Sequence, residues 1–294
     1  MGRRLISAAV DDDDLVVGQV LAWGVPRLRD LPWRRTRDPW AILVSEVMLQ
    51  QTQVARVERS WATFMAAYPT PAVCAQASLG DVLRHWEGLG YPRRARDLHA
   101  TASRVVEHFD GQMPRDLDAL LELPGIGPYT ARAVRAFAFG LDAAIVDTNV
   151  ARVLARTSGR RLTPKEVQGR ADALAPIGEA WVWNQVMLDL GATVCTARSP
   201  TCGACPVARS CAWSTSGYPE PDPAVGSAGV SGSQTRFEGS DRQLRGRLLR
   251  AAARGSLAEI TGAVDGDRQR VERVLAGLVA DGLLVRSGDG HHLP

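Results

Sequence analysis

One short stretch constrains the fold of this chain more than any other: LPGIGPYT at residues 123–130, with apolar helical patterns on both sides. Asp116 is a good N-cap for the first helix, and Pro128 suits the first position of the second. Gly125 and Gly127 permit a turn that a β-carbon would obstruct, and their amides can approach an anion such as a phosphate. The stretch predicts a tight helical hairpin with an anion-binding turn, and a plain helical corner is the alternative.

Helical patterns account for the rest of the chain up to about residue 280, so an all-α core is expected. The chain has 294 residues, of which 45% are hydrophobic and 23% charged, a globular composition. No segment approaches the roughly 20 apolar residues of a membrane span. We therefore expect a cytoplasmic protein without a membrane partner. The formal net charge of +3 does not by itself indicate a nucleic-acid binder.

A polar cluster, SEVMLQQTQ, lies on an otherwise apolar helix predicted for residues 40–53. Asp38 and Pro39 give that helix its start signal. Around Glu46, three of the four residues one turn away are apolar. Such a carboxyl at the edge of a buried face is expected to have a raised pKa. A solvated helix glutamate is the alternative.

The segment EGLGYPRRAR forms a glycine-rich turn before another helix. It carries Tyr91 and three arginines, Arg93, Arg94 and Arg96. An aromatic ring beside clustered arginines suits insertion next to a base, with the cations on phosphates. A solvated, charged helix start fits these residues equally well.

Four cysteines lie within seventeen residues near the end of the core, spaced C-x6-C-x2-C-x5-C: Cys195, Cys202, Cys205 and Cys211. Four thiolates on one short loop favour a metal centre over free thiols. Residue type alone does not separate tetrahedral zinc from an iron–sulfur cluster, because both accept four cysteines.

The composition changes after the cysteines. Ser, Gly and Pro supply 12 of the 22 residues at 214–235, which predicts a flexible linker. Residues 236–294 then form a separate small unit. Helices are expected at 241–253, after a capping box at 256–259, and from Asp267 to about 280, followed by a hairpin turning at 288–290. Three helices and a hairpin suggest a winged-helix-like fold.

With SEVMLQQTQ, EGLGY, LPGIGPYT, VDTN and the four cysteines in this order, the chain resembles the MutY family of adenine DNA glycosylases, within the endonuclease III superfamily. The resemblance spans about residues 15–213. It implies a helix-hairpin-helix glycosylase core at 1–213, with a six-helix barrel at 30–142 and an iron–sulfur domain at 1–29 and 143–213. The cysteine spacing matches the family's 4Fe–4S loop. The family excises adenine paired with 8-oxoguanine or guanine in base excision repair, after flipping the nucleotide out of the duplex.

The resemblance implies a role for each matching residue. Glu46 matches the general acid that protonates adenine, and Asp147 matches the carboxylate that stabilises the sugar cation. Tyr129 and Asn149 match residues that form hydrogen bonds in the active site, and Gln185 matches a residue that faces the adenine. The residues that read 8-oxoguanine or wedge beside it are matched by Gln51, Thr52, Leu89 and Tyr91. The phosphate-binding glycines of the hairpin are matched by Gly125 and Gly127. Arg93 and Arg94 are expected at phosphates. A simple helix N-cap is the alternative for Asp147.

Tyr129 stands where the bifunctional endonuclease III enzymes have a lysine, so the resemblance implies a monofunctional glycosylase. The competing hypotheses are a thymine glycosylase for G:T mispairs and a non-enzymatic iron–sulfur DNA-binding protein. The expected partner is double-stranded DNA, bound by a monomer, at the nucleoid of a bacterium. Two departures stand out: Pro92 replaces a second tyrosine, and residues 236–294 are too short for the family's Nudix-like domain. We therefore expect the C-terminal unit to affect both adenine mispairs alike.

Overall fold

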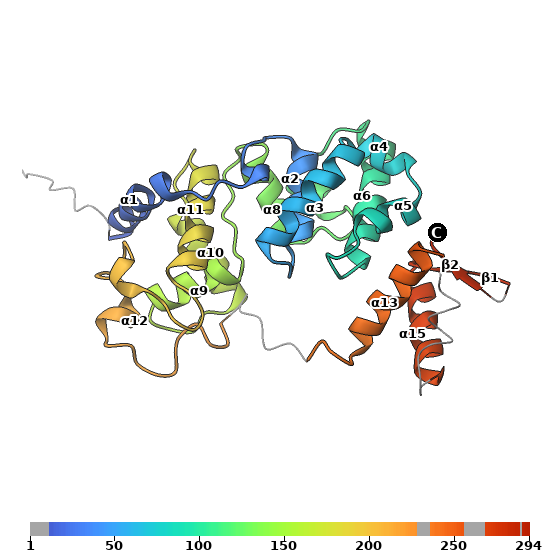
Figure 1. The fold of residues 1–294 in the computed structure, drawn as a ribbon. Helices are drawn as coiled ribbons and strands as arrows, with labels where there is room; N and C mark the ends of the chain where they lie inside the picture. The colour runs from blue at the N-terminus through green and yellow to red at the C-terminus, as the bar shows by residue number, and fades with distance from the viewer. Residues whose placement is uncertain (1–11, 228–235, 256–267, 289) are drawn as a thin grey trace, which may run out of the picture. The chain divides into compact units, whose positions relative to one another are not determined.

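The computed structural model describes residues 12–227, 236–255, 268–288 and 290–294, and most of these residues are helical (Figure 1). The all-α prediction for the core is confirmed. The chain divides into two compact units. One comprises Met1–Asp30 and Arg132–Gly232, and the other comprises Leu31–Ala131 and Ser233–Pro294. The core is thus divided after residues 30 and 131, whereas the sequence suggested 29 and 142.

The unit that includes Leu31–Ala131 is built on short helices around an apolar core. Its elements there are η2 (Pro32–Arg34), α2 (Pro39–Leu49), α3 (Val54–Ala67), α4 (Pro71–Gln76), α5 (Leu79–His85), α6 (Arg93–Phe109), α7 (Leu117–Leu121) and the start of α8 (Pro128–Phe137). Helix α6 packs against α2, α4 and α5. Phe64 and Leu98 are among the fully buried side chains at the centre.

The C-terminal residues belong to this same unit. Helices α13 (Asp241–Ala253) and α15 (Arg268–Ala280) pack together, and strands β1 (Val285–Ser287) and β2 (Gly290–His292) form the predicted hairpin. Asp281 forms ion pairs with Arg93 and Arg245, and its carbonyl accepts a hydrogen bond from Arg96 at 2.6 Å. The helix predicted after the capping box at 256–259, and the cap Asp267, lie outside the described residues.

The other unit is organised around α11 (Ala180–Thr193). Its remaining elements are α1 (Asp12–Gly24), η1 (Val25–Arg27), α9 (Thr148–Thr157), α10 (Pro164–Leu174), η3 (Cys202–Ala204) and α12 (Ala212–Thr215). Helices α1 and α9 pack against α11. Leu154, Val186 and Leu190 belong to the shared apolar core. In neither unit does a described helix combine the length and apolar composition of a membrane span.

Several helices begin at a side chain that caps them. The carboxylates of Asp38, Asp116 and Asp147 each accept a backbone N–H of the helix that follows. Thr163 and Glu166 form a capping box at the start of α10. These caps are local, since the capping side chain and the amide it accepts lie within three residues.

One helix end was wrongly predicted. The sequence suggested a helix to residue 53, but α2 ends at Leu49. Gln51 has φ of 56°, in the left-handed region, so the helix cannot continue through it. Gln51 and Thr52 therefore lie in a turn.

The flexible linker predicted at 214–235 is wrong for residues 214–227. The Trp213 indole N–H donates to the Pro219 carbonyl at 3.0 Å, and Asp222 pairs with the buried Arg156. The Leu162 amide donates to the hydroxyl of Ser227, which is only 4% exposed. Ser, Gly and Pro here build an ordered segment, and residues 228–235 lie outside the described residues.

Candidate active site and cysteine loop

Glu46 lies near the middle of α2, a helix whose residues Trp40 to Met48 are all buried. Its own exposed fraction is 4%. The prediction of a carboxyl on a buried face is confirmed. Burial of a carboxyl disfavours its charged form, and this is the only contribution to its charge state that the burial of Glu46 establishes.

The helical hairpin is built by α7, the turn at 122–127 and α8. Gly125 has φ of +73°, and a β-carbon there would lie 2.8 Å from the β-carbon of Asp97 on α6. The Thr101 hydroxyl, also on α6, donates to the Pro124 carbonyl at 2.8 Å. Gly127 is exposed, and a β-carbon on it would meet no atom within 4 Å. The predicted hairpin is confirmed, and its exposed turn has room for an anion.

Tyr129 lies in the first turn of α8 and is half-buried. Its phenol bears no amine that could form an imine with a sugar aldehyde. Within the same unit, then, the structure holds Glu46, Tyr129 and the hairpin glycines.

Asp147 caps α9 in the other unit. It accepts hydrogen bonds from the amides of Asn149 and Val150, at 2.8 and 2.7 Å, and from the Asn149 side-chain amide at 2.8 Å. Burial raises the pKa of the Asp147 carboxyl above its ordinary value, while these hydrogen bonds and Arg152 oppose that rise. Three donors and the N-terminus of a helix all favour the carboxylate form.

A buried network that the sequence did not reveal orients Asn149. Arg152, 7% exposed, donates to the Asn149 side-chain oxygen at 2.8 Å, and also to the carbonyls of Gly191 and Cys195, both at 2.6 Å. A β-carbon on Gly191 would lie 2.6 Å from that of Asn149. This absent side chain lets α11 approach the first turn of α9. A glycine within a helix pattern was the available signal.

Gln185 lies on α11 of this unit and is 4% exposed. It therefore shares a unit with Asp147, Asn149 and the cysteines. The Gln185 amide is thus a buried polar group on a largely apolar helix, at a position where an apolar side chain is more usual.

The residues matched to the opposite base lie on two turns joined by Arg94. Its guanidinium donates to the carbonyls of Val47, Met48 and Gln50 at the end of α2, at 2.7 to 3.0 Å. It also donates to the carbonyls of Leu89 and Gly90, both at 3.0 Å, and to the Thr52 hydroxyl at 3.1 Å. Thr52 in turn donates to the Leu89 carbonyl at 3.2 Å. Arg94 thus fixes one turn against the other.

Two residues on these turns, Gln51 and Tyr91, have left-handed backbones, with φ of 56° and 48°. Such conformations are costly for residues other than glycine and are frequent at functional sites. Tyr91 is 38% exposed, whereas Leu89 is 3% exposed. Tyr91 is therefore accessible at the surface of the turn, while Leu89 packs into the interior and holds the turn in place.

The arginines of this region each have partners within the protein. Arg94 binds protein carbonyls, Arg93 pairs with Asp281, and Arg96 binds Asp97 as well as the Asp281 carbonyl. The sequence could not indicate this, because the acceptors at Val47 and Asp281 are far away in the chain. We assign Arg94 a structural role in shaping the two turns.

All four cysteines of the predicted metal centre line one cavity, together with Leu190, Val194, Val207 and Trp213. All four cysteines are free thiols. Burial raises the pKa of the Cys205 thiol to about 11 and also raises that of Cys211, so a bound cation is needed to hold them as thiolates. Among the described residues, no three His, Cys, Asp or Glu side chains converge on a single metal ion. Four cysteines lining one cavity are a donor set that both zinc and an iron–sulfur cluster accept.

Comparison with known proteins identifies the relationship. Residues 44–176 match the model of the HhH-GPD superfamily of base excision DNA repair proteins. An adenine DNA glycosylase of Mycolicibacterium smegmatis is 42% identical over 282 residues, covering 92% of this chain and 93% of that protein. The chain belongs to the adenine DNA glycosylase family.

Solved structures of the wider superfamily resemble the glycosylase core. A thermostable thymine-DNA glycosylase superposes with a TM-score of 0.67 at 31% identity, over 69% of this chain and 97% of that one. A trapped endonuclease III–DNA covalent intermediate superposes with a TM-score of 0.62 at 27% identity, again over 69% of this chain and 97% of that one. These neighbours confirm the helix-hairpin-helix glycosylase fold predicted from the sequence.

Proposed function

We propose that this protein is a monofunctional glycosylase that hydrolyses the N-glycosidic bond of adenine paired with 8-oxoguanine or guanine in double-stranded DNA. The observation that carries the proposal is a pair of carboxyl groups in contrasting environments. Glu46 is buried on an apolar helix, while Asp147 receives three hydrogen bonds at a helix N-terminus. One group suits proton donation and the other suits stabilisation of positive charge, as in glycoside hydrolysis.

Adenine is a poor leaving group as an anion. Glu46, protonated because its site disfavours the charged form, donates its proton to N7 so that adenine leaves as a neutral base. Asp147, as a carboxylate held by three hydrogen-bond donors, stabilises the sugar as positive charge develops at C1′. Asn149 keeps the Asp147 carboxylate in place through the 2.8 Å hydrogen bond. Water then completes the hydrolysis.

Other residues recognise the substrate. Gln185 offers a buried amide to the edge of the flipped adenine. The exposed turn at Gly127 and the N-terminus of α8 bind a backbone phosphate. Gln51, Thr52 and Tyr91 contact the base opposite, with the exposed Tyr91 residue beside it and the buried Leu89 supporting its turn. Because Tyr129 cannot form an imine, strand cleavage through a Schiff base is excluded from the scheme. The protein acts as a monomer on nucleoid DNA in the cytoplasm.

The four-cysteine cavity suits a 4Fe–4S cluster, held by Cys195, Cys202, Cys205 and Cys211. When bound, such a cluster supplies a cross-link within residues 195–211 and a one-electron couple. The thiols come from the end of α11, from η3 and from the cap of α12, so closure of the loop depends on them.

The test is excision by wild type and Glu46→Gln on duplexes with A:8-oxoguanine, A:G and G:T mispairs. The amide keeps the size of the side chain but supplies no proton, so adenine excision is expected to fall by about 10²–10⁴-fold. Duplex affinity should be retained. Glu58→Gln, on α3, is the control and should leave both excision and affinity unchanged.

Substantial excision by Glu46→Gln would show that Glu46 is not the acid. Thymine release from G:T, with adenine left in place, would favour the thymine glycosylase that the structural neighbour represents. Binding to all three duplexes with no base release by wild type would favour the non-enzymatic alternative.

A further inference from the structure

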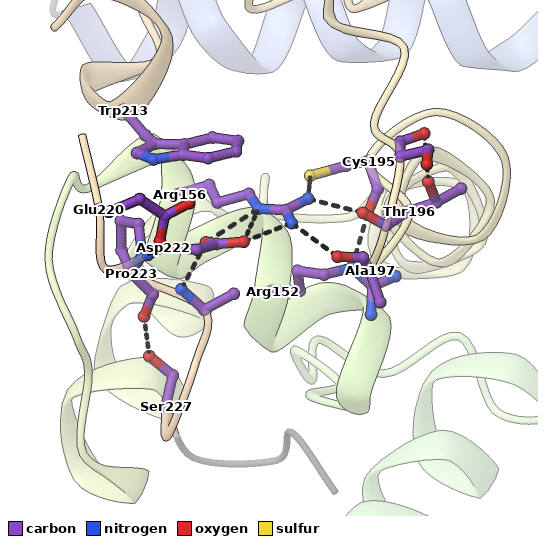
Figure 2. Close-up of polar contacts among 12 residues, drawn as sticks. Arg152, Arg156, Cys195, Thr196, Ala197, Trp213, Glu220, Asp222, Pro223 and Ser227 are labelled. Carbon is purple, nitrogen blue, oxygen red and sulfur yellow. Dashed lines mark hydrogen bonds and ion pairs between the residues drawn. The ribbon is translucent and has the colours of Figure 1, made fainter. Parts of the chain in front are cut away.

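Arg156 on α9 is the most buried cation that the structure describes close to the cysteine loop, with an exposed fraction of 2%. Figure 2 shows its guanidinium between two segments that are distant in the sequence. On one side, Asp222 accepts from it at 2.6 Å. On the other, it donates to the Thr196 and Ala197 carbonyls, at 2.7 and 3.2 Å, and to the Cys195 sulfur at 3.4 Å.

The ring of Trp213 covers the guanidinium, with the Arg156 Cζ atom 4.7 Å from the ring centroid. Trp213 follows Cys211 by two residues, and its indole N–H donates to the Pro219 carbonyl. Asp222, the Thr196 carbonyl and the Trp213 ring thus surround one cation. A buried cation in a fixed position can act electrostatically on its neighbours with little screening by water.

The segment at 217–227 holds Asp222 in place. The Ala224 amide donates to the Asp222 carboxylate at 2.9 Å. The Ser227 hydroxyl donates to the Pro223 carbonyl at 2.6 Å and accepts from the Leu162 amide at 3.2 Å, while Arg161 donates to the Gly226 carbonyl. Asp222 therefore sits on a segment anchored at both ends of its short turn.

The charge of Asp222 decides whether Arg156 can remain buried. An unpaired cation in this position would be costly, and removal of one partner of a buried pair is strongly destabilising. Without the carboxylate, Arg156 would be expected to move toward solvent. Its contact with the Cys195 sulfur would then be lost.

We propose that Asp222 is a positioning residue for the cysteine site: it holds Arg156 so that the guanidinium donates a hydrogen bond to the Cys195 sulfur. This rests on the proposed 4Fe–4S cluster. A charged hydrogen-bond donor on a ligating thiolate stabilises the more negative, reduced state of a cluster, and so raises its reduction potential. The ordered segment after the last cysteine is therefore a functional part of the cluster site.

The test compares wild type, Asp222→Asn and Arg156→Lys as full-length, cluster-loaded proteins. Asp172→Asn is the matched control, because Asp172 also pairs with an arginine of this unit, Arg132, at 2.8 Å. The measurements are the iron content, the absorption near 400 nm, the reduction potential by voltammetry and the rate of cluster loss in ferricyanide.

Asp222→Asn is expected to shift the equilibrium toward the oxidised cluster about tenfold, which is 59 mV for a one-electron couple. Cluster loss in ferricyanide should be faster, and Asp172→Asn should match wild type. Arg156→Lys covers the case in which Asp222→Asn fails to fold. It keeps the ion pair with Asp222 but withdraws the donor from Cys195, so the iron content should be retained while the potential falls.

A wild-type potential in Arg156→Lys, or in a folded Asp222→Asn, would overturn the proposal, even with a lower melting temperature. Stoichiometric zinc in the wild-type protein would overturn it as well. Adenine excision by the wild type reports separately on the proposed function, so the two failures are distinguishable.

Discussion

Two arginines, the half-buried Arg94 of one unit and the buried Arg156 of the other, are held in different ways. Arg94 joins the end of α2 to the turn at 88–91, and its hydrogen bonds go to five carbonyls and one hydroxyl. Arg156 joins the cysteine loop to the segment at 217–227 and pairs with a carboxylate. Burial lowers the pKa of Arg94 to about 10. Burial also acts to lower the pKa of Arg156, but the hydrogen bonds from it to Asp222 and Cys195 raise it overall.

The difference indicates what each arginine does. A ring of neutral carbonyls offsets little of the cost of burying a charge, so Arg94 is retained for the backbone shape that it imposes. That shape includes the left-handed residues Gln51 and Tyr91. Arg156 is balanced by charge, and it brings distant parts of the chain together. Arg94 fixes the backbone conformation of two turns, whereas Arg156 holds the cysteine loop and the segment at 217–227 together.

The largest effect is expected from Arg94→Ala. The substitution removes the Arg94 donor from the carbonyls of the buried residues Val47 and Met48, at about 1–3 kcal/mol for each group left unsatisfied. Because such costs are not additive, we expect a total loss of about 3–5 kcal/mol, seen as a lower melting temperature by circular dichroism. Arg93→Ala, at a side chain that is 62% exposed, is the control and should melt near wild type. Equal melting of the two variants would contradict the structural role of Arg94.

A smaller effect should separate the two arginines by function. Lysine keeps the charge, but its three donors on one nitrogen cannot span both turns around Arg94. We expect Arg94→Lys to weaken binding to A:8-oxoguanine about tenfold, or ~1.4 kcal/mol, measured in the Glu46→Gln background to prevent turnover. Arg156→Lys in the same background should bind as tightly as its parent. The comparison fails if Arg156→Lys has the weaker affinity.

The smallest effect concerns acid. Burial raises the pKa of Asp222, but hydrogen bonds from Arg156 and the Ala224 amide lower it by more, so its pKa lies below the ordinary value. The pair therefore stabilises the fold fully above about pH 4, and this contribution is lost as the pH falls through the folded-state pKa. The difference in free energy of unfolding between wild type and Asp222→Asn should therefore narrow from pH 6 to pH 3. Arg94 has no carboxylate partner among the described residues, so the stability difference between wild type and Arg94→Lys should not depend on pH in this way. A similar narrowing for Arg94→Lys would argue against the distinction between a carbonyl-bound and a carboxylate-paired arginine.

Local signals made part of the fold and site predictable. Asp38, Asp116 and Thr163 cap helices through contacts within three residues, and the hairpin glycines have a backbone requirement that is visible in the sequence. The apolar neighbours of Glu46 likewise predicted its burial. In these cases the residues that interact are close together in the chain.

The rest depended on partners that the sequence does not place together. The carbonyls bound by Arg94 include that of Val47, 47 residues away. Every residue has a backbone carbonyl, so the amino-acid sequence does not show which of them accepts a hydrogen bond from Arg94. Asp222 lies 66 residues from Arg156, within a composition rich in Ser, Gly and Pro. A composition rich in Ser, Gly and Pro indicates a high conformational entropy cost of ordering the segment. It does not indicate the ion pair with the buried Arg156 that offsets this cost.

Gly191 has a consequence for how this protein tolerates mutation. It has no functional group, yet even a methyl group there would lie 2.7 Å from the Asn149 carbonyl oxygen. Every substitution, however conservative by chemical class, must displace the first turn of α9, the turn that Asp147 caps. Loss-of-function alleles should therefore arise at a position that a search for reactive side chains would pass over, in a protein that still folds and still carries both carboxyl groups.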